Sequence, residues 1–447
     1  MDIKQTAPKL NPLINTQQVD LMDRPQLIAD FNLVRSETER LCAPLVTEDY
    51  MVQTMPDVSP PKWHLAHVSW FFETFLLGKY AKDYKVFHPA FDYLFNSYYV
   101  QHGKPFLRPK RGLLSRPTVA EVYDYRAHVD QAIRQLIETC SEEDLPILRD
   151  LIILGLNHEQ QHQELLYTDI LHIFSENPLC PAYKPLPISE APKASELKWV
   201  EVEGGLVEIG HKGEGFAYDN ESPNHQFFLK DFKLASRPVS NADFMAFIDD
   251  GGYQRPEFWF SEGWATVNER SWDKPMYWEK QDGKWMHMTL HGQQAVNPDA
   301  PACHISHFEA AAYAAWAGKR LPTEFEWEHA SGLIEQDTNG QWPGNLLDPG
   351  TEKPLITRAG TPTAEPLQQM FGDVWEWTSS PYTGYPGYKP AKGAIGEYNG
   401  KFMSKQLVLR GGSFVTPRNH IRASYRNFFY SPDRWQFTGL RLADDAD

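Results

Sequence analysis

The chain has 447 residues, of which 41% are hydrophobic and 13% aromatic, enough for two domains with buried cores. A formal net charge of −16 argues against nucleic acid and anionic membrane surfaces as partners. The 4 cysteines are scattered, the first residues carry no apolar signal segment, and no apolar run approaches ~18 residues. We therefore expect a soluble, cytoplasmic protein with reduced thiols.

The first part of the chain predicts a helical bundle. After a polar arm over residues 1–22, apolar residues recur at helical spacing in four stretches. A long connection rich in aromatic and basic residues separates the second stretch from the third, and such loops are usually functional. The four helices are expected to begin near Asp23, Trp63, Thr118 and Leu145. This pattern predicts a four-helix bundle over residues 23–176, a fold that often holds metals between its helices.

The fourth stretch carries the sequence His158-Glu-Gln-Gln-His162-Gln-Glu164. At about 100° per residue, His158 and His162 lie ~40° apart on one face and one turn apart in height, so both imidazoles can bind one metal ion. Glu164 lies roughly 200° from His162 at the same pitch and is not expected to be a ligand. Taken alone, the pattern also fits two solvated or hydrogen-bonded histidines on a polar helix face.

The character of the sequence changes after residue 176. Residues 177–198 hold five prolines and almost no periodicity, which predicts a semi-rigid linker. From residue 199 to residue 447 the chain is rich in Gly, Trp and Tyr, with short alternating segments and few helical pieces. We expect this part to be a domain dominated by loops, and the whole chain to be a two-domain α+β protein.

Several phrases of the second domain are distinctive: Val202-Glu-Gly-Gly205, Arg237-Pro-Val-Ser-Asn241, His307-Phe-Glu-Ala-Ala-Ala-Tyr313, Ala317-Gly-Lys-Arg-Leu-Pro-Thr-Glu324-Phe-Glu-Trp327, Gly372-Asp-Val-Trp-Glu-Trp377, Leu409-Arg-Gly-Gly-Ser413 and Gly439-Leu-Arg441. In content and order they resemble the formylglycine-generating-enzyme/sulfatase-modifying family, whose fold is C-type-lectin-like. The cysteine pair that binds copper in the formylglycine-generating enzymes has no counterpart near the C-terminal phrases. The catalysis of those enzymes is therefore not expected here.

In the first domain, Trp63-x-Leu-Ala-His67 and His158-x3-His162-x-Glu164 resemble the metal motifs of DinB-like four-helix bundles. The two domains in this order resemble the EgtB-type sulfoxide synthases of ergothioneine biosynthesis, over roughly residues 25–445. The resemblance implies a non-haem iron oxygenase with its active site between the domains. Such an enzyme uses O₂ to join a thiol to N-alpha-trimethylhistidine and leaves the sulfur as a sulfoxide.

The resemblance makes His67, His158 and His162 the ligands of Fe(II), and leaves out His64, three positions before His67. Three neutral imidazoles leave coordination positions open for substrates and O₂. The expected partners are therefore these small molecules. The sequence leaves the oligomeric state open, a homo-oligomer included.

The resemblance also suggests residues that bind the amino-acid substrate. Gln161 and Asn427 match family residues that contact trimethylhistidine, and Phe428 adjoins Asn427. Amide or arginine groups suit the carboxylate of this zwitterion, and aromatic faces suit its ammonium group. For most aromatic residues of the second domain, packing in the core is the alternative.

The sequence departs from the actinobacterial members of the family in its tyrosines. Ile395 stands where those enzymes place their catalytic tyrosine. Asn96-Ser-Tyr98-Tyr99, in the long connection of the first domain, instead resembles the second type of these enzymes, in which loop tyrosines take over. We expect Tyr98 or Tyr99 to donate a proton that diverts the reaction from thiol dioxygenation to C–S bond formation.

A second departure concerns the thiol. Phe429 stands where the actinobacterial type has an aspartate that helps to hold gamma-glutamylcysteine, which favours a smaller donor such as cysteine. Arg108 and Arg111 are the basic candidates for the carboxylate of the thiol substrate. The alternative is that both are solvated loop arginines.

Four other functions fit parts of the pattern. The same scaffold serves an ovothiol-type 5-histidylcysteine sulfoxide synthase or a selenoneine synthase. A protein of another class would hold a ligand in the lectin-like domain and structural zinc on the histidines, without catalysis. A simple thiol dioxygenase would give a product without histidine.

Overall fold

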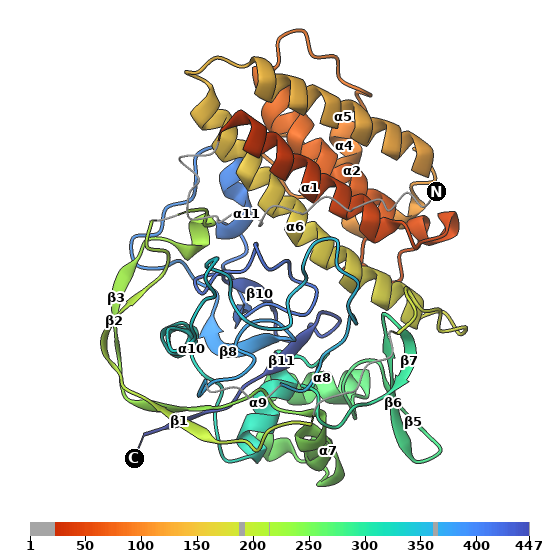
Figure 1. Ribbon diagram of the computed structural model, residues 1–447. Helices are drawn as coiled ribbons and strands as arrows, with labels where there is room; N and C mark the ends of the chain where they lie inside the picture. Colours follow the sequence, from red (N-terminus) through yellow and green to blue (C-terminus); the bar gives the residue numbers. More distant parts are fainter. Residues whose placement is uncertain (1–22, 187–192, 214, 361–364, 447) are drawn as a thin grey trace, which may run out of the picture.

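The computed structural model describes residues 23–186, 193–213, 215–360 and 365–446 (Figure 1). A helical part lies against a larger part of strands, loops and short helices, and α6 (Leu145–Ser175) runs along the boundary between them (Figure 1). Within the described ranges, no helix is long and apolar enough to cross a bilayer. The expected arm and residues 187–192 of the expected linker lie outside the described residues.

Four long helices form the bundle: α1 (Arg24–Cys42), α2 (Pro61–Phe72), α5 (Val119–Thr139) and α6. Their starts follow the sequence, because Asp23 accepts a hydrogen bond from the first turn of α1 and Thr118 forms a capping box on α5. All 12 residues of α2 are buried, as expected of a helix that is apolar nearly all round. The helix continues through a π-helical turn, Glu73–Leu77, into α3 (Gly78–Tyr80).

The long connection between α3 and α5 contains α4 (Phe91–Phe95) and a 3-10 helix, Arg108–Leu113. Asn96 organises the bend that follows α4. Its amide nitrogen donates to the backbone carbonyl of Tyr99 at 3.2 Å, and its side-chain oxygen accepts from the Tyr99 amide at 3.1 Å. A fixed backbone turn therefore holds Tyr98 and Tyr99, the two tyrosines singled out in the sequence.

The second part is built from small sheets joined by long loops. The strand orders are β10-β9-β8-β11, β1-β4-β12, β5-β6-β7 and β2-β3. The strands are β1 (Trp199–Val202), β2 (Gly205–Ile209), β3 (His225–Leu229), β4 (Phe232–Ala235), β5 (Trp278–Gln281), β6 (Lys284–Thr289), β7 (Gly292–Ala295), β8 (Trp375–Pro381), β9 (Gln406–Arg410), β10 (Asn427–Tyr430), β11 (Thr438–Leu440) and β12 (Ala443–Asp445). The helices of this part are α7 (Asn241–Asp249), α8 (Ser261–Arg270), α9 (His307–Trp316), α10 (Glu324–Ser331) and α11 (Glu397–Gly400).

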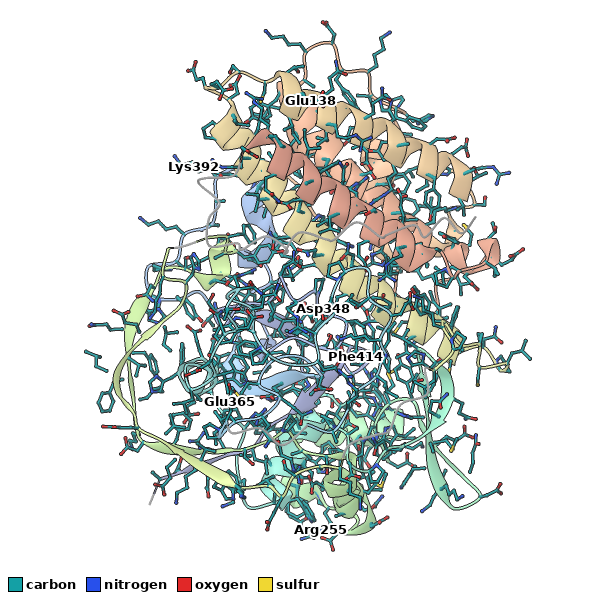
Figure 2. All side chains as sticks on the ribbon, in the orientation of Figure 1. Glu138, Arg255, Asp348, Glu365, Lys392 and Phe414 are labelled. Carbon is teal, nitrogen blue, oxygen red and sulfur yellow. The ribbon has the colours of Figure 1, made fainter. Side chains whose placement is uncertain are left out.

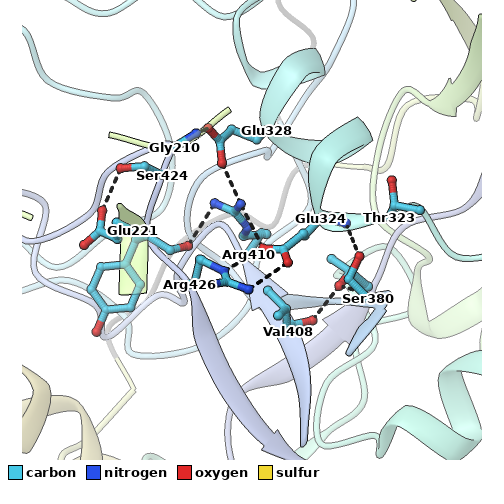
Figure 3. Close-up of polar contacts among 12 residues, drawn as sticks. Gly210, Glu221, Thr323, Glu324, Glu328, Ser380, Val408, Arg410, Ser424 and Arg426 are labelled. Atoms are coloured by element: carbon cyan, nitrogen blue, oxygen red, sulfur yellow. Dashed lines mark hydrogen bonds and ion pairs between the residues drawn. The ribbon is translucent and has the colours of Figure 1, made fainter. Parts of the chain in front are cut away.

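A buried network of ion pairs fixes the start of β10 (Figure 3). Arg410 Nη2 lies 2.6 Å from Glu328 and 3.2 Å from Glu324, and Arg426 Nε lies 2.8 Å from Glu324. Charges removed from water cost much free energy unless they are paired, and here each has a partner. Because Arg426 directly precedes Asn427, the network determines where the backbone of β10 enters the boundary between the two parts.

One of the two buried apolar clusters extends across both parts, and the other lies in the second part. The buried cluster that includes α2 and α6 also includes Phe414, which lies in the interior just below α6 in the view of Figure 2. Glu164 on α6 ties the parts further, since it accepts hydrogen bonds from Trp375 at 2.6 Å, Ser413 at 2.7 Å and Thr416 at 2.8 Å. Its carboxylate is thus occupied by the second part, in agreement with the prediction that it is not a metal ligand.

Candidate metal centre and active site

Three buried histidines from two helices meet at the boundary. His67 comes from α2, and His158 and His162 come from successive turns of α6. A ring nitrogen from each lies within 4.8 Å of the others, and the three side chains are 0%, 4% and 7% exposed. The structure therefore brings together the three histidines that the sequence analysis singled out as ligands.

The close approach of α2 and α6 depends on a small residue. Gly155 lies one turn before His158, and a Cβ atom built there would be 2.6 Å from Cε1 of Phe72 on α2. Such a contact is shorter than packed side chains allow, so a larger residue would push the helices apart. The glycine thus lets the His67 helix come within reach of the other two imidazoles.

Burial keeps these imidazoles neutral. It lowers the pKa of His158 to about 4 and lowers the pKa of His67 and of His162 well below the usual range. His67 Nδ1 donates to the Phe95 carbonyl at 2.6 Å. Among the described residues, neither Nε2 of His67 nor either nitrogen of His158 has a hydrogen-bond partner. Unpartnered, neutral nitrogens that converge in a buried site fit a metal ion, and imidazole is a ligand of iron, zinc and copper.

The third imidazole is backed by groups that the sequence analysis did not assign. His162 Nδ1 lies 2.8 Å from Nδ1 of His64, and His64 Nε2 lies 2.9 Å from Asp169 Oδ2. His64 is 2% exposed and Asp169 is 3% exposed. Helical spacing places His64 on the face of His67, so the sequence alone could not separate a ligand from a neighbour of a ligand.

A cavity of about 380 Å³ lies beside the histidines, between the bundle and the second part. Its walls include seven of the residues predicted from the sequence: Tyr98, Arg108, Arg111, Gln161, His162, Asn427 and Phe428. Phe428 is held flat against Tyr382, with ring centroids 4.1 Å apart. Loops and strands far apart in sequence thus converge on the histidine cluster.

The two arginines of this cavity differ in their surroundings. Arg108 is largely exposed and lies 3.7 Å from Asp57. Arg111 is 4% exposed, donates to Ser59 Oγ at 2.8 Å and lies over the Trp63 ring at 3.3 Å. No carboxylate of the described residues lies within ion-pair distance of Arg111, and burial followed by the charge of Arg108 lowers its pKa. A buried guanidinium without an anion is a site for one.

A larger cavity, of about 820 Å³, lies on the side of His158. Tyr99 lines it, whereas Tyr98 lines the smaller cavity. Gln161 and Tyr398 line both. The tyrosine pair and the Gln161 side chain therefore lie where the two cavities meet the metal helix.

The phenols around the site hold their protons, with Tyr99 buried and Tyr98 and Tyr398 half-buried. Burial, reinforced by neighbouring tyrosines, raises the pKa of Tyr98 and that of Tyr99 above the usual range. The rings of Tyr98 and Tyr99 lie 5.0 Å apart, and the ring of Tyr398 lies 5.5 Å from that of Tyr98. Tyr398 was not predicted as a site residue, because no local pattern links it to a helix that begins more than 200 residues earlier.

Both parts of the chain match known families. Residues 30–166 match the DinB superfamily, and residues 187–446 match the sulfatase-modifying factor enzyme 1-like domain. The predicted fold class, an α+β chain with a DinB-like helical domain and a formylglycine-generating-enzyme-like domain, is confirmed.

Relatives of known activity span both domains. The hercynine oxygenase of Mycolicibacterium smegmatis is 32% identical over 95% of this chain and 100% of its own length, and that of Mycolicibacterium thermoresistibile is 31% identical over 88% of this chain and 89% of its own length. The chain belongs to the hercynine oxygenase family. The predicted resemblance to EgtB-type enzymes is thereby confirmed, whereas the roles of individual site residues stay predictions.

The second domain also has separate relatives. The formylglycine-generating enzyme of Streptomyces coelicolor is 28% identical over 56% of this chain and 89% of its own length. The structure of PvdO from Pseudomonas aeruginosa aligns with 56% of this chain and 94% of its own, at 20% identity and a TM-score of 0.37.

Proposed function

We propose that this member of the hercynine oxygenase family is an Fe(II)- and O₂-dependent sulfoxide synthase that joins a thiol to hercynine, N-alpha-trimethylhistidine. The observation that carries the proposal is the cluster of three neutral imidazoles with nitrogens within 4.8 Å of one another, beside a cavity shared by both domains. The net reaction consumes a thiol S–H, an imidazole C–H and one O₂. It forms a C–S bond and an S–O bond and releases one water.

His67, His158 and His162 would hold the iron. When bound, Fe(II) would activate O₂ and accept the thiolate and the substrate imidazole as ligands. The chain supplies these histidines in the neutral form, because their burial lowers the pKa of each. The three histidine side chains are only 0%, 4% and 7% exposed, so little bulk water reaches them.

Hercynine would be recognised by groups of both domains. Gln161 is the neighbour of His162 and already lies between two phenols of the second domain. Asn427 offers a second amide for the carboxylate, and the face of Phe428 suits the trimethylammonium group. The buried network behind Arg426 holds this strand in place, so the amide and the ring are positioned before the substrate arrives.

The thiol would be held through its carboxylate. Arg111 is the stronger of the two basic candidates, since it is buried and forms no ion pair with a carboxylate of the described residues. The cavity is small, and Phe429 stands where an acidic residue would serve a longer donor. We therefore propose cysteine as the thiol, with Arg108 near the cavity mouth in a lesser role.

A tyrosine would favour C–S bond formation over dioxygenation of the thiol. Tyr98 and Tyr99 are protonated at neutral pH, so either can give a proton to the reacting oxygen. Without that proton, the thiol would be oxidised to a sulfinate and would not be joined to hercynine. With it, the sulfur goes on to the imidazole carbon.

The test is product analysis with defined substrates. Protein loaded with Fe(II) under anaerobic conditions is mixed with air, hercynine and either cysteine or gamma-glutamylcysteine, and the products are identified by mass spectrometry. A hercynine–cysteine sulfoxide is expected. In parallel assays, a product formed only when histidine replaces hercynine would favour the ovothiol-type activity, and one formed only when a selenium donor replaces the thiol would favour the selenoneine synthase. Sulfinate alone would favour a thiol dioxygenase, and tight zinc without O₂ uptake a binding protein.

A further inference from the structure

A chain of buried polar side chains runs from the metal cluster into α6. Asp169 lies two turns after His162 on the same helix, and His64 lies one turn before His67 on α2. His64 bridges the two, with Nδ1 at 2.8 Å from Nδ1 of His162 and Nε2 at 2.9 Å from Asp169 Oδ2. None of these side chains is among the substrate contacts proposed above.

The hydrogen bonds of this chain have a fixed direction. Asp169 Oδ2 also accepts the backbone N–H of Ser59 at 2.8 Å, which holds the carboxylate in place as an acceptor. A neutral His64 must then carry its hydrogen on Nε2 and accept at Nδ1. The facing Nδ1 of His162 therefore carries a hydrogen, and only its Nε2 has a lone pair for a metal.

We propose that His64 and Asp169 are positioning residues that orient the His162 ring and strengthen it as a metal ligand. The inference rests on the proposed function for the assignment of His67, His158 and His162 as ligands. Groups that accept a hydrogen bond from a ligating imidazole fix its tautomer and raise its basicity, and their loss typically weakens metal binding about 10- to 100-fold.

The three ligands consequently differ in the hydrogen bonds that hold their rings. His162 is backed by an imidazole and a carboxylate, His67 by the Phe95 carbonyl at 2.6 Å, and His158 by no protein group. His162 should therefore be the strongest donor of the three and the one whose ring is least free to turn. His64 is not free to bind the metal itself, since its two nitrogens are engaged by His162 and Asp169.

The experiment measures Co(II) binding by the full-length protein, which separates metal affinity from catalysis. The dissociation constant is obtained by competition with a chelator, and the visible absorption of bound Co(II) reports the ligand field. His64→Leu removes the acceptor, and we expect the dissociation constant to rise about 10- to 100-fold with a shifted spectrum. His64→Asn places an amide oxygen near the position of Nδ1 and should recover much of the affinity.

A matched control is available on α6, the helix of His162 and Asp169. His172 is also buried, and its Nδ1 contacts Thr54 Oγ1 at 2.7 Å and not the cluster. His172→Leu should leave the dissociation constant and the spectrum unchanged. Circular dichroism and thermal melts of the metal-free variants show whether each one folds.

Unchanged Co(II) affinity and spectrum in His64→Leu would overturn the proposal. If that variant does not fold, Asp169→Asn carries the test, and wild-type affinity and spectrum in it would overturn the proposal equally. Wild-type protein that binds Co(II) as described, but with Fe(II) makes no hercynine-derived product, would refute the proposed function and leave this inference standing.

Discussion

Gln161 and Tyr398 are joined across the domain boundary by a hydrogen bond of 2.9 Å, from the Tyr398 hydroxyl to Gln161 Oε1. The Gln161 amide nitrogen in turn donates to the Tyr425 hydroxyl at 2.6 Å. The side chain next to His162 is thus held by two phenols of the second domain. The Tyr398 hydroxyl is already engaged by Gln161, whereas Tyr98 and Tyr99 hydrogen-bond to each other.

The first prediction concerns these tyrosines. Tyr98→Phe or Tyr99→Phe should shift the product from the sulfoxide toward cysteine sulfinate, because one proton donor is lost. A positioned general acid contributes about 10²–10⁴-fold, so sulfoxide formation should fall by roughly 100-fold or more in the variant that lacks the donor. The ratio of the two products is measured by mass spectrometry.

Tyr398→Phe is the matched comparison, since it also removes one buried phenol beside Gln161. It should slow turnover and leave the product ratio unchanged. If both loop variants keep the wild-type ratio, the loop tyrosines are not the donor, and a shift confined to Tyr398→Phe would assign the role to that residue.

The second prediction concerns Arg111. Arg111→Gln should raise the KM for cysteine about 10- to 100-fold and leave the KM for hercynine nearly unchanged, because a hydrogen bond to a charged group contributes about 1.5–3 kcal/mol. Steady-state O₂ consumption with each substrate varied in turn measures both constants. Arg108→Gln, at the exposed position, should have a smaller effect, and the opposite order would exchange the two roles.

The third prediction concerns the packing of α2 on α6. Gly155→Val should destabilise the bundle by about 1–3 kcal/mol and weaken Co(II) binding, because the new side chain meets the Phe72 ring. Urea unfolding and chelator competition measure the two effects. Gly103→Val is the control, since a Cβ at Gly103 meets no atom within 4 Å. Equal results at both positions would show that the close helix contact does not shape the metal site.

Much of the helical domain follows from local sequence. The starts of α1 and α5 are given by Asp23 and Thr118, whose side chains can satisfy free amides of the first turn. The helices α8 and α10 of the second domain were not predicted. Residues such as Glu324 are fixed there by buried arginines from distant strands, and such pairing leaves no local pattern.

The site was predictable only in part for the same reason. The spacing of His158 and His162 predicts a shared face, but His67 was assigned from family resemblance, and no sequence rule distinguishes it from His64. Arg111 is buried and Arg108 is exposed, and this difference depends on the whole fold. Contacts across the domain boundary, such as that of Tyr398, require the second domain to be in place.

The last prediction is that buried histidines away from the metal cluster make the fold less stable in acid. Burial lowers the pKa of His307 to about 4, that of His287 to about 4 and that of His304 to about 3. Below the usual histidine pKa of about 6.5, these histidines bind protons in the unfolded chain but stay neutral in the folded chain. The free energy of unfolding should therefore fall as the pH drops from 6.5 toward 4, by roughly 1.4 kcal/mol per pH unit for each such histidine, and should not depend on them above 6.5.

His307→Phe isolates one of these contributions. The His307 ring stacks on Phe260 and meets the edge of Trp377, so a phenyl ring can keep these aromatic contacts. Urea unfolding of the metal-free protein at several pH values should give a slope shallower by about 1.4 kcal/mol per pH unit between pH 6 and 4.5. His88→Phe, at an exposed position, should keep the wild-type slope. A His307→Phe slope equal to that of the wild type would mean that His307 gains its proton equally in both states, and that its burial does not limit stability in acid.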